Sequence, residues 1–266
     1  MRLLKLTPDG EFSLTKDLIN NIPPYAILSH TWGDNDEEVT FKDLTEGSGT
    51  AKAGYEKIRF CGAQAAHDGL KHFWVDTCCI DKSNNSELSE AIISMFRWYR
   101  NATKCYVYLA DVSTNDRGPT FQTLSWESAF RKSRWFTRGW TLQELIAPSS
   151  VEFFSLEGKL LGSKKSLEQQ VHEVTGIAVQ ALRGSTLSIF SVTERLSWAE
   201  FRDTQREEDR AYSLLGMFNI NMPPLYGEGM ESAFRRLREE INKSLGSSQD
   251  GKWRVLVYFY HLLTRG

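Results

Sequence analysis

The segment Tyr25-Ala26-Ile27-Leu28-Ser29-His30-Thr31-Trp32 begins with four apolar residues and continues into Ser, His and Thr. A short apolar run is typical of a strand buried on both faces of a parallel sheet. The same plan recurs twice, where His72–Val75 leads to Asp76 and Cys105–Leu109 leads to Asp111. These segments predict three parallel strands that carry polar residues at their carboxyl ends.

Helical patterns separate these strands. Apolar residues three or four positions apart, from Tyr55 to Ala65 and from Leu88 to Tyr99, predict two amphipathic helices, the second with Ser86 as N-cap. Alternating strands and helices favour an α/β fold in which helices cover both faces of a parallel sheet. A further strand is predicted at Val151–Phe154.

The remaining carboxyl-terminal part is predicted to be an appended helical layer, residues 166–243. One of its helices is predicted over residues 207–218, with Thr204 and Glu207 as a capping box. We expect one domain over residues 1–243, with the sheet core in residues 25–155. Residues 244–266 are expected to be a linker and a tail that contains the apolar segment Trp253–Tyr260.

The composition excludes several classes of function. Lys and Arg number 32 against 34 Asp and Glu, so the basic footprint of a nucleic-acid-binding protein is absent. The four cysteines lack the spacing of a zinc site or a disulfide framework, and we expect no metal. No apolar run approaches the roughly 18 residues that a membrane span needs, and no signal sequence opens the chain. The predicted location is the cytoplasm.

Polar side chains at the carboxyl ends of parallel strands are candidates for ligand binding, because ligands bind beyond these ends. Here they are Ser29, His30, Trp32, Asp76 and Thr77. Two structural roles stand beside this interpretation: His30 could hydrogen bond loop backbone, and Asp76 could cap a turn or helix. Cys78 as a nucleophile paired with His30 is a further alternative.

A second candidate region is the run from Trp135 to Pro148, where Pro148 ends a short predicted helix. Trp140 and Glu144 lie four residues apart, so they project from one helix face and could place an acid beside a flat stacking surface. Thr141 and Glu144 also fit a capping box, in which the glutamate would satisfy a backbone N–H at the helix start.

Four segments together resemble the fungal heterokaryon incompatibility (HET) domain, and in particular the amino-terminal domain of incompatibility proteins that carry a nucleotide-binding module and WD repeats. The matching segments are Tyr25–Gly33, Phe73–Asp81, Arg138–Leu145 and Thr204–Gly216. The resemblance implies a role in non-self recognition, in which the domain executes cell death after a sensor domain or self-association activates it.

A more distant resemblance links Ser133–Leu145 to the Toll/interleukin-receptor (TIR) pattern Ser-x-Trp-Cys-x-x-Glu-Leu, with Thr141 at the Cys position. It implies a TIR-like, flavodoxin-like fold and NAD cleavage, with NAD as substrate and no bound cofactor. On this basis the candidate catalytic residues are Glu144, His30 and Asp76, and the candidate substrate-binding residues are Ser29, Trp32, Thr77, Arg138 and Trp140. The alternative is a non-enzymatic death-fold adaptor that oligomerises.

Overall fold

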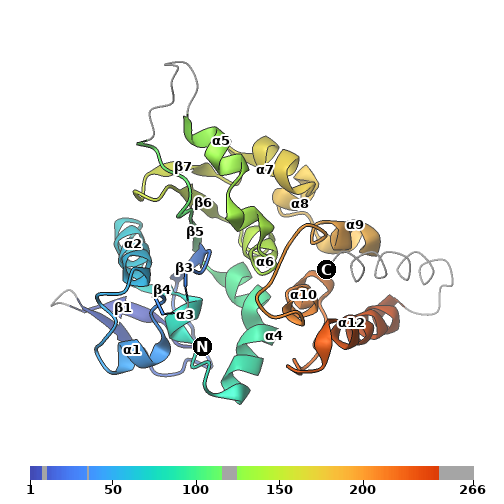
Figure 1. Cartoon of the computed structure of the whole chain (residues 1–266), viewed down its shortest axis with the longest axis horizontal. Helices are drawn as coiled ribbons and strands as arrows, with labels where there is room; N and C mark the ends of the chain where they lie inside the picture. Colours follow the sequence, from blue (N-terminus) through green and yellow to red (C-terminus); the bar gives the residue numbers. More distant parts are fainter. Residues whose placement is uncertain (8–10, 35, 116–124, 246–266) are drawn as a thin grey trace.

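The computed structural model describes residues 1–7, 11–34, 36–115 and 125–245 (Figure 1). Its centre is a mixed sheet of seven strands in the order β2-β1-β4-β3-β5-β6-β7. The strands are β1 (Leu4–Leu6), β2 (Phe12–Leu14), β3 (Tyr25–His30), β4 (His72–Trp74), β5 (Lys104–Tyr108), β6 (Val151–Phe154) and β7 (Leu160–Ser163).

The four predicted strands, β3 to β6, are present and pair in parallel, which confirms the α/β class. The sheet as a whole is mixed, however, and extends beyond the predicted core of residues 25–155. Strands β1 and β2 extend the sheet beside β4, and β7 extends it beside β6, all with antiparallel pairing. Each has only three or four residues, too few for an alternating pattern to stand out in the sequence.

Helices flank the sheet and form a separate carboxyl-terminal group. The α-helices are α1 (Phe41–Thr45), α2 (Gly54–His67), α3 (Asp76–Cys79), α4 (Asn85–Asn101), α5 (Ser125–Arg131), α6 (Thr141–Ile146), α7 (Glu168–Thr175), α8 (Val179–Leu182), α9 (Val192–Ser197), α10 (Asp209–Tyr212), α11 (Leu215–Phe218) and α12 (Gly229–Leu245), with 3-10 helices at Arg134–Thr137 and Leu187–Ile189. The N-cap of α4 is Asn84 rather than Ser86, because the Asn84 side chain accepts from the N–H groups of Ser86 and Glu87.

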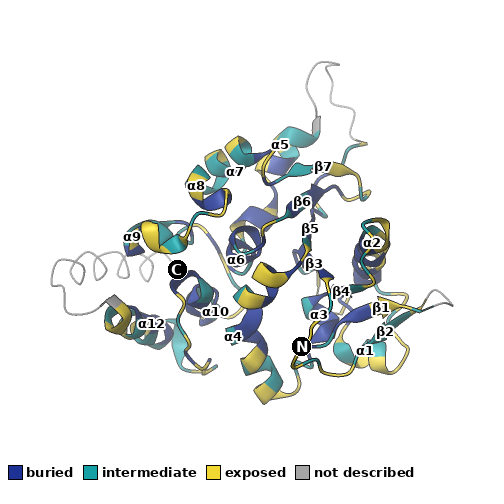
Figure 2. Ribbon diagram, turned by 180° about the vertical axis from the view of Figure 1, so that it is seen from behind, coloured by how far each residue is buried: buried dark blue, intermediate teal, exposed yellow. Residues whose placement is uncertain are grey.

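The two faces of the sheet are covered by different helices, as the alternation of side chains along a strand requires. On β4, Phe73 packs edge-on against Phe12 and lies close to Gly62 of α2, whereas the next residue, Trp74, packs against Trp98 and Tyr99 of α4. Figure 2 shows the resulting band of buried residues along the sheet and the inner side of α4.

In the helical layer, α10 and α12 lie on the far side of α4 from the sheet, whereas α7 and α8 lie beside α5 and α6 (Figure 1). Here α11 lies so close to α4 that a Cβ atom on Gly216 would come within 2.2 Å of Phe96. The layer is present as predicted, but one expected helix over residues 207–218 is divided into α10 and α11. The predicted tail from residue 246 onward lies outside the described residues. In the ranges described, no helix has the length and apolar character needed to cross a bilayer.

Candidate functional site

A cavity of about 370 Å³ opens at the carboxyl ends of the parallel strands. Its lining comes from the ends of β3 and β4, from α4, from α6 and the loop before it, and from the helical layer. The winding of the sheet reverses between β3 and β5, since β4 lies on one side of β3 and β5 on the other. A ligand crevice is expected at such a reversal.

Glu144 lies at the buried end of this cavity. The Ser29 hydroxyl donates a hydrogen bond to its carboxyl (2.5 Å), and the indole N–H of Trp135 donates to the same hydroxyl (2.8 Å). Burial raises the pKa of Glu144 to about 8, and the charge of Asp76 acts in the same direction against the opposing hydrogen bond from Ser29. The carboxyl is therefore largely protonated at neutral pH.

The capping-box interpretation of Glu144 is wrong. The N-cap of α6 is Trp140, which makes no side-chain capping bond. The Thr141 hydroxyl instead donates to the carbonyls of Trp135 and Arg138 (2.6 and 2.8 Å), which leaves the Glu144 carboxyl to face Ser29.

Asp76 begins α3 and organises the other side of the cavity. Its two carboxylate oxygens contact His30 Nε2 (3.0 Å) and the indole N–H of Trp32 (2.8 Å). Burial would raise the pKa of Asp76, but the His30 hydrogen bond and the Lys82 charge outweigh it and hold the pKa at about 2. Two carboxyls of opposite protonation state thus face one cavity, an arrangement common in acid–base sites.

The loop after β3 is fixed by a buried ion pair between Glu38 and Lys57. The Glu38 carboxylate also accepts from the backbone N–H of Gly33 (2.7 Å), and the Lys57 ammonium donates to the carbonyl of Thr31 (3.0 Å). These bonds hold the backbone on both sides of Trp32, so its ring is oriented before any ligand binds.

Most of the predicted site residues meet at this cavity. Those that line it are His30, Trp32, Asp76, Arg138, Trp140 and Glu144. Ser29 and Thr77 are not among the lining residues. Ser29 lies one residue below the strand end, covered by Glu144 and Trp135, and Thr77 is buried in α3. The catalytic and binding roles of all eight residues remain predictions.

Sequence reasoning missed the part of the lining that the helical layer contributes. Arg206, Asp209 and Tyr226 face the cavity, and the Tyr226 hydroxyl donates to Asp209 (2.8 Å). Burial raises the pKa of Asp209. The run around Arg206 resembles an ordinary solvated helix start, and nothing local in it indicates the distant sheet edge. The expected capping box of Thr204 and Glu207 is absent, since α10 begins at Asp209 without a side-chain cap.

Arg202 joins the helical layer to α6. Its buried guanidinium donates to the Arg138 carbonyl and the Thr141 hydroxyl (both 2.9 Å). Burial lowers the pKa of Arg202 to about 9, against the opposing charge of Glu144. Arg202 therefore fixes the start of the helix that carries Glu144.

The thiols take no part in the cavity. Cys78 is fully buried, donates to the Val75 carbonyl, and has a pKa that burial raises well above the ordinary value. The proposed Cys78 and His30 pair therefore lacks an accessible nucleophile. Among the described residues, no group of three or more His, Cys, Asp or Glu side chains is arranged to hold a metal ion.

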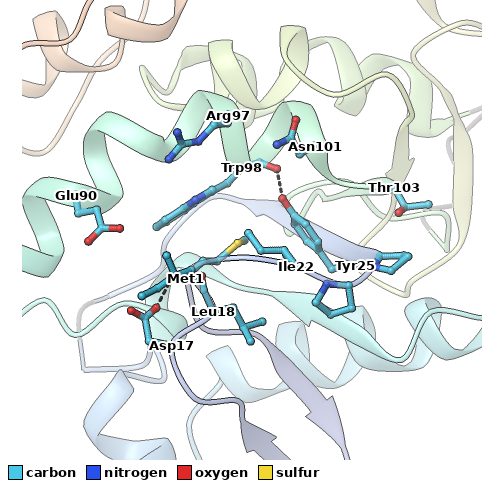
Figure 3. A pocket seen from close by; sticks show the side chains of 13 residues that line it. Met1, Asp17, Leu18, Ile22, Tyr25, Glu90, Arg97, Trp98, Asn101 and Thr103 are labelled. Atoms are coloured by element: carbon cyan, nitrogen blue, oxygen red, sulfur yellow. Dashed lines mark hydrogen bonds and ion pairs between the residues drawn. The ribbon is translucent and has the colours of Figure 1, made fainter.

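A second, larger cavity of about 540 Å³ lies at the amino-terminal end of β3 (Figure 3). The Tyr25 hydroxyl donates to the Trp98 carbonyl within it (2.5 Å), and the Arg97 guanidinium donates to Ser94 (3.0 Å). It lies at the end of the parallel strands opposite to the one where ligands bind in such sheets, so size alone does not make it the candidate site.

The fold and the cavity define an α/β domain with a ligand-sized polar site at the carboxyl edge of its sheet. Residues 25–129 match the family described as "Heterokaryon incompatibility protein (HET)". The chain is also 61% identical over 251 residues to the "Vegetative incompatibility protein HET-E-1" of Podospora anserina, across 94% of this chain. The chain therefore belongs to the HET domain family. It spans 18% of the length of that relative. No solved structure matches it significantly.

Proposed function

We propose that this domain is a cytoplasmic effector of fungal non-self recognition that acts by cleaving NAD at the nicotinamide–ribose bond. The incompatibility role is supported by the family and by the name of the 61% identical relative. The proposed reaction rests chiefly on Glu144, a buried carboxyl at the end of a cavity with indole rings on its walls. The TIR-like pattern around Glu144 agrees with this reaction and with a flavodoxin-like domain.

The chemistry requires a carboxylate beside the ribose. When the glycosidic bond breaks, its electron pair moves to the pyridinium nitrogen, neutral nicotinamide leaves, and positive charge develops on the ribose as an oxocarbenium-like state. A carboxylate in a water-poor site stabilises this charge. Water then adds to the anomeric carbon and releases a proton.

Protonation of Glu144 in the free domain is compatible with this role. A pyridinium cation bound beside the carboxyl would favour its ionised form, because an opposite charge nearby lowers the pKa of an acid. Trp140 and Trp32 offer flat surfaces for the aromatic ring. Asp76, ionised and bound to His30, provides a second negative charge and a histidine that can relay the proton released by water.

The test is expression of the domain fused to an inducible dimeriser in fungal cells, because we propose that self-association or a sensor partner activates it. We expect loss of NAD and cell death with the unaltered domain. Glu144→Gln should abolish both while the protein remains folded, because Gln retains an acceptor for Ser29 but carries no charge.

The second candidate is a non-enzymatic adaptor that assembles through its sheet. The observation in its favour is that β7 forms one end of the sheet and carries Leu160, which is 60% exposed. An open strand edge can pair with another chain. Death with unchanged NAD levels in both the unaltered and the Glu144→Gln proteins would support the adaptor and reject the enzyme.

A further inference from the structure

Three basic side chains line the cavity without forming an ion pair with any carboxylate among the described residues: Lys82, Arg138 and Arg206. Other basic side chains pair with carboxylates, as Lys57 does with Glu38, or donate to backbone carbonyls, as Arg202 does. Lys82 still lowers the pKa of Asp76 through its charge, and the charge of Arg206 acts in the same direction on Asp209. A cation at a cavity without a direct ion pair is available to a negatively charged ligand.

Two of these cations are held in place by aromatic rings. The Lys82 ammonium lies 3.6 Å from the centre of the Trp32 ring, and the Arg206 guanidinium lies 4.2 Å from that of Tyr226. Stacking uses the flat face of a guanidinium and leaves its N–H edge free for phosphate oxygens. Trp32 belongs to the sheet edge and Tyr226 to the helical layer, so the cations stand on opposite walls.

The charges follow a gradient from the interior to the mouth. Glu144 is buried and Asp76 partly so, whereas Arg206 is exposed and Arg138 half-buried. Lys82 is half-buried on the Asp76 side, against the Trp32 ring that donates to Asp76. Asp203 and Asp209 also line the cavity. Asp209 accepts a hydrogen bond from the Tyr226 hydroxyl. Asp203 is exposed, and its backbone pairs with that of Arg138, so its negative charge offsets one of the three positive charges. The interior therefore suits a cationic group and the mouth an anionic one.

The size of the cavity agrees with a ligand of which only one part lies inside it. Its volume of about 370 Å³ is near the lower end of the range of small-molecule sites, roughly 300–1,000 Å³. A pyridine ring and its ribose would occupy the interior, and groups beyond the ribose would lie across the mouth. In a dinucleotide the group at that place is the diphosphate.

We propose that Lys82, Arg138 and Arg206 form a diphosphate clamp that recognises the substrate as a dinucleotide. This inference rests on the proposed function, since it specifies which part of NAD each end of the cavity contacts. The clamp is completed by the helical layer through Arg206, so the sheet alone does not make the whole binding site.

The test is calorimetric titration of the full chain with ADP-ribose, which contains the diphosphate, and with nicotinamide riboside, which contains no phosphate. Arg138→Gln and Arg206→Gln should each weaken ADP-ribose binding about tenfold, as loss of one charge-assisted hydrogen bond does. Both should leave nicotinamide riboside binding within about twofold, because the clamp does not touch it. Arg59→Gln, on the exposed side of α2, removes the same charge and should change neither affinity.

Thermal unfolding of each variant checks that it is folded, and Arg206→Glu provides a second variant at an exposed position that should weaken ADP-ribose binding further. No binding of ADP-ribose by the unaltered chain, or equal affinity in the Arg59 and Arg206 variants, overturns the clamp. ADP-ribose binding that depends on the clamp without nicotinamide release from NAD would reject the cleavage reaction alone. Cleavage of NAD by Arg138→Gln and Arg206→Gln with the same KM as the unaltered protein would reject the clamp alone.

Discussion

Glu144→Gln should make the folded protein more stable at high pH, although it removes the proposed catalytic group. The reason is the environment of this carboxyl, which is 8% exposed and accepts a hydrogen bond from Ser29. Burial raises its pKa from the ordinary 4.5 to about 8. Ionising it inside the protein is therefore unfavourable, whereas a Gln side chain never ionises.

The sign and the size of the effect follow from the two pKa values. The folded protein binds this proton more tightly than the unfolded chain, so the stability from the protonated carboxyl is complete below about pH 4.5 and is lost as pH rises toward 8. At about 1.4 kcal/mol per pKa unit, the loss between about pH 5 and pH 8 is about 3 kcal/mol. The advantage of Glu144→Gln over the unaltered protein should grow by this amount.

The assay is urea unfolding of both proteins at several pH values, because comparison at each pH cancels the titration of all other groups. A suitable control is Glu168→Gln on the surface, where the hydrogen bond from Arg183 lowers the pKa of Glu168. This variant should gain no stability as pH rises. A free-energy difference between the Glu144→Gln and unaltered proteins that stays constant with pH would mean that Glu144 is ionised in the folded state, and would refute the reasoning.

Three further predictions concern the same region. The kcat/KM for NAD cleavage should rise with pH up to about 8 and then level off, since it follows the ionised fraction of Glu144 in the free enzyme; a flat profile between about pH 6 and pH 9 would exclude this carboxylate. Ser29→Ala should move that rise in kcat/KM to higher pH in a pH–rate profile, because the Ser29 hydrogen bond lowers the Glu144 pKa. It should also cost about 1–3 kcal/mol of stability in urea unfolding, because the Trp135 indole N–H is left without an acceptor. Ile92→Ala should destabilise the protein by about 2–5 kcal/mol in the same unfolding assay, because Ile92 is 5% exposed; a loss below about 0.5 kcal/mol would contradict its burial.

The sequence predicts the central part of this fold because the signal there is local. The apolar run Tyr25–Leu28 is buried on both faces, so it contains no polar positions, and its polar continuation marks the carboxyl edge. Chain order and the rule for parallel sheets then bring His30 and Asp76 together. The antiparallel edge strands carry no comparable signal, since Leu4–Leu6 and Phe12–Leu14 have three residues each.

The rest of the site depends on contacts between distant parts of the chain. The pattern of Thr141 and Glu144 fits a capping box equally well, and only the position of Ser29 beneath Glu144 decides between the two interpretations. Arg206 and Tyr226 reach the cavity because α11 packs against α4, which carries the helical layer to the sheet edge. No spacing within residues 203–226 indicates that arrangement.

Nicotinamide release from NAD by the purified, dimerised domain tests the account most directly, with the unaltered protein and Glu144→Gln measured side by side at about pH 8. We predict time-dependent release by the unaltered protein and a loss of at least about a hundredfold in the variant, as when a group that stabilises transition-state charge is removed. Equal release by both proteins, or none by the unaltered protein while it still kills cells, would contradict the account.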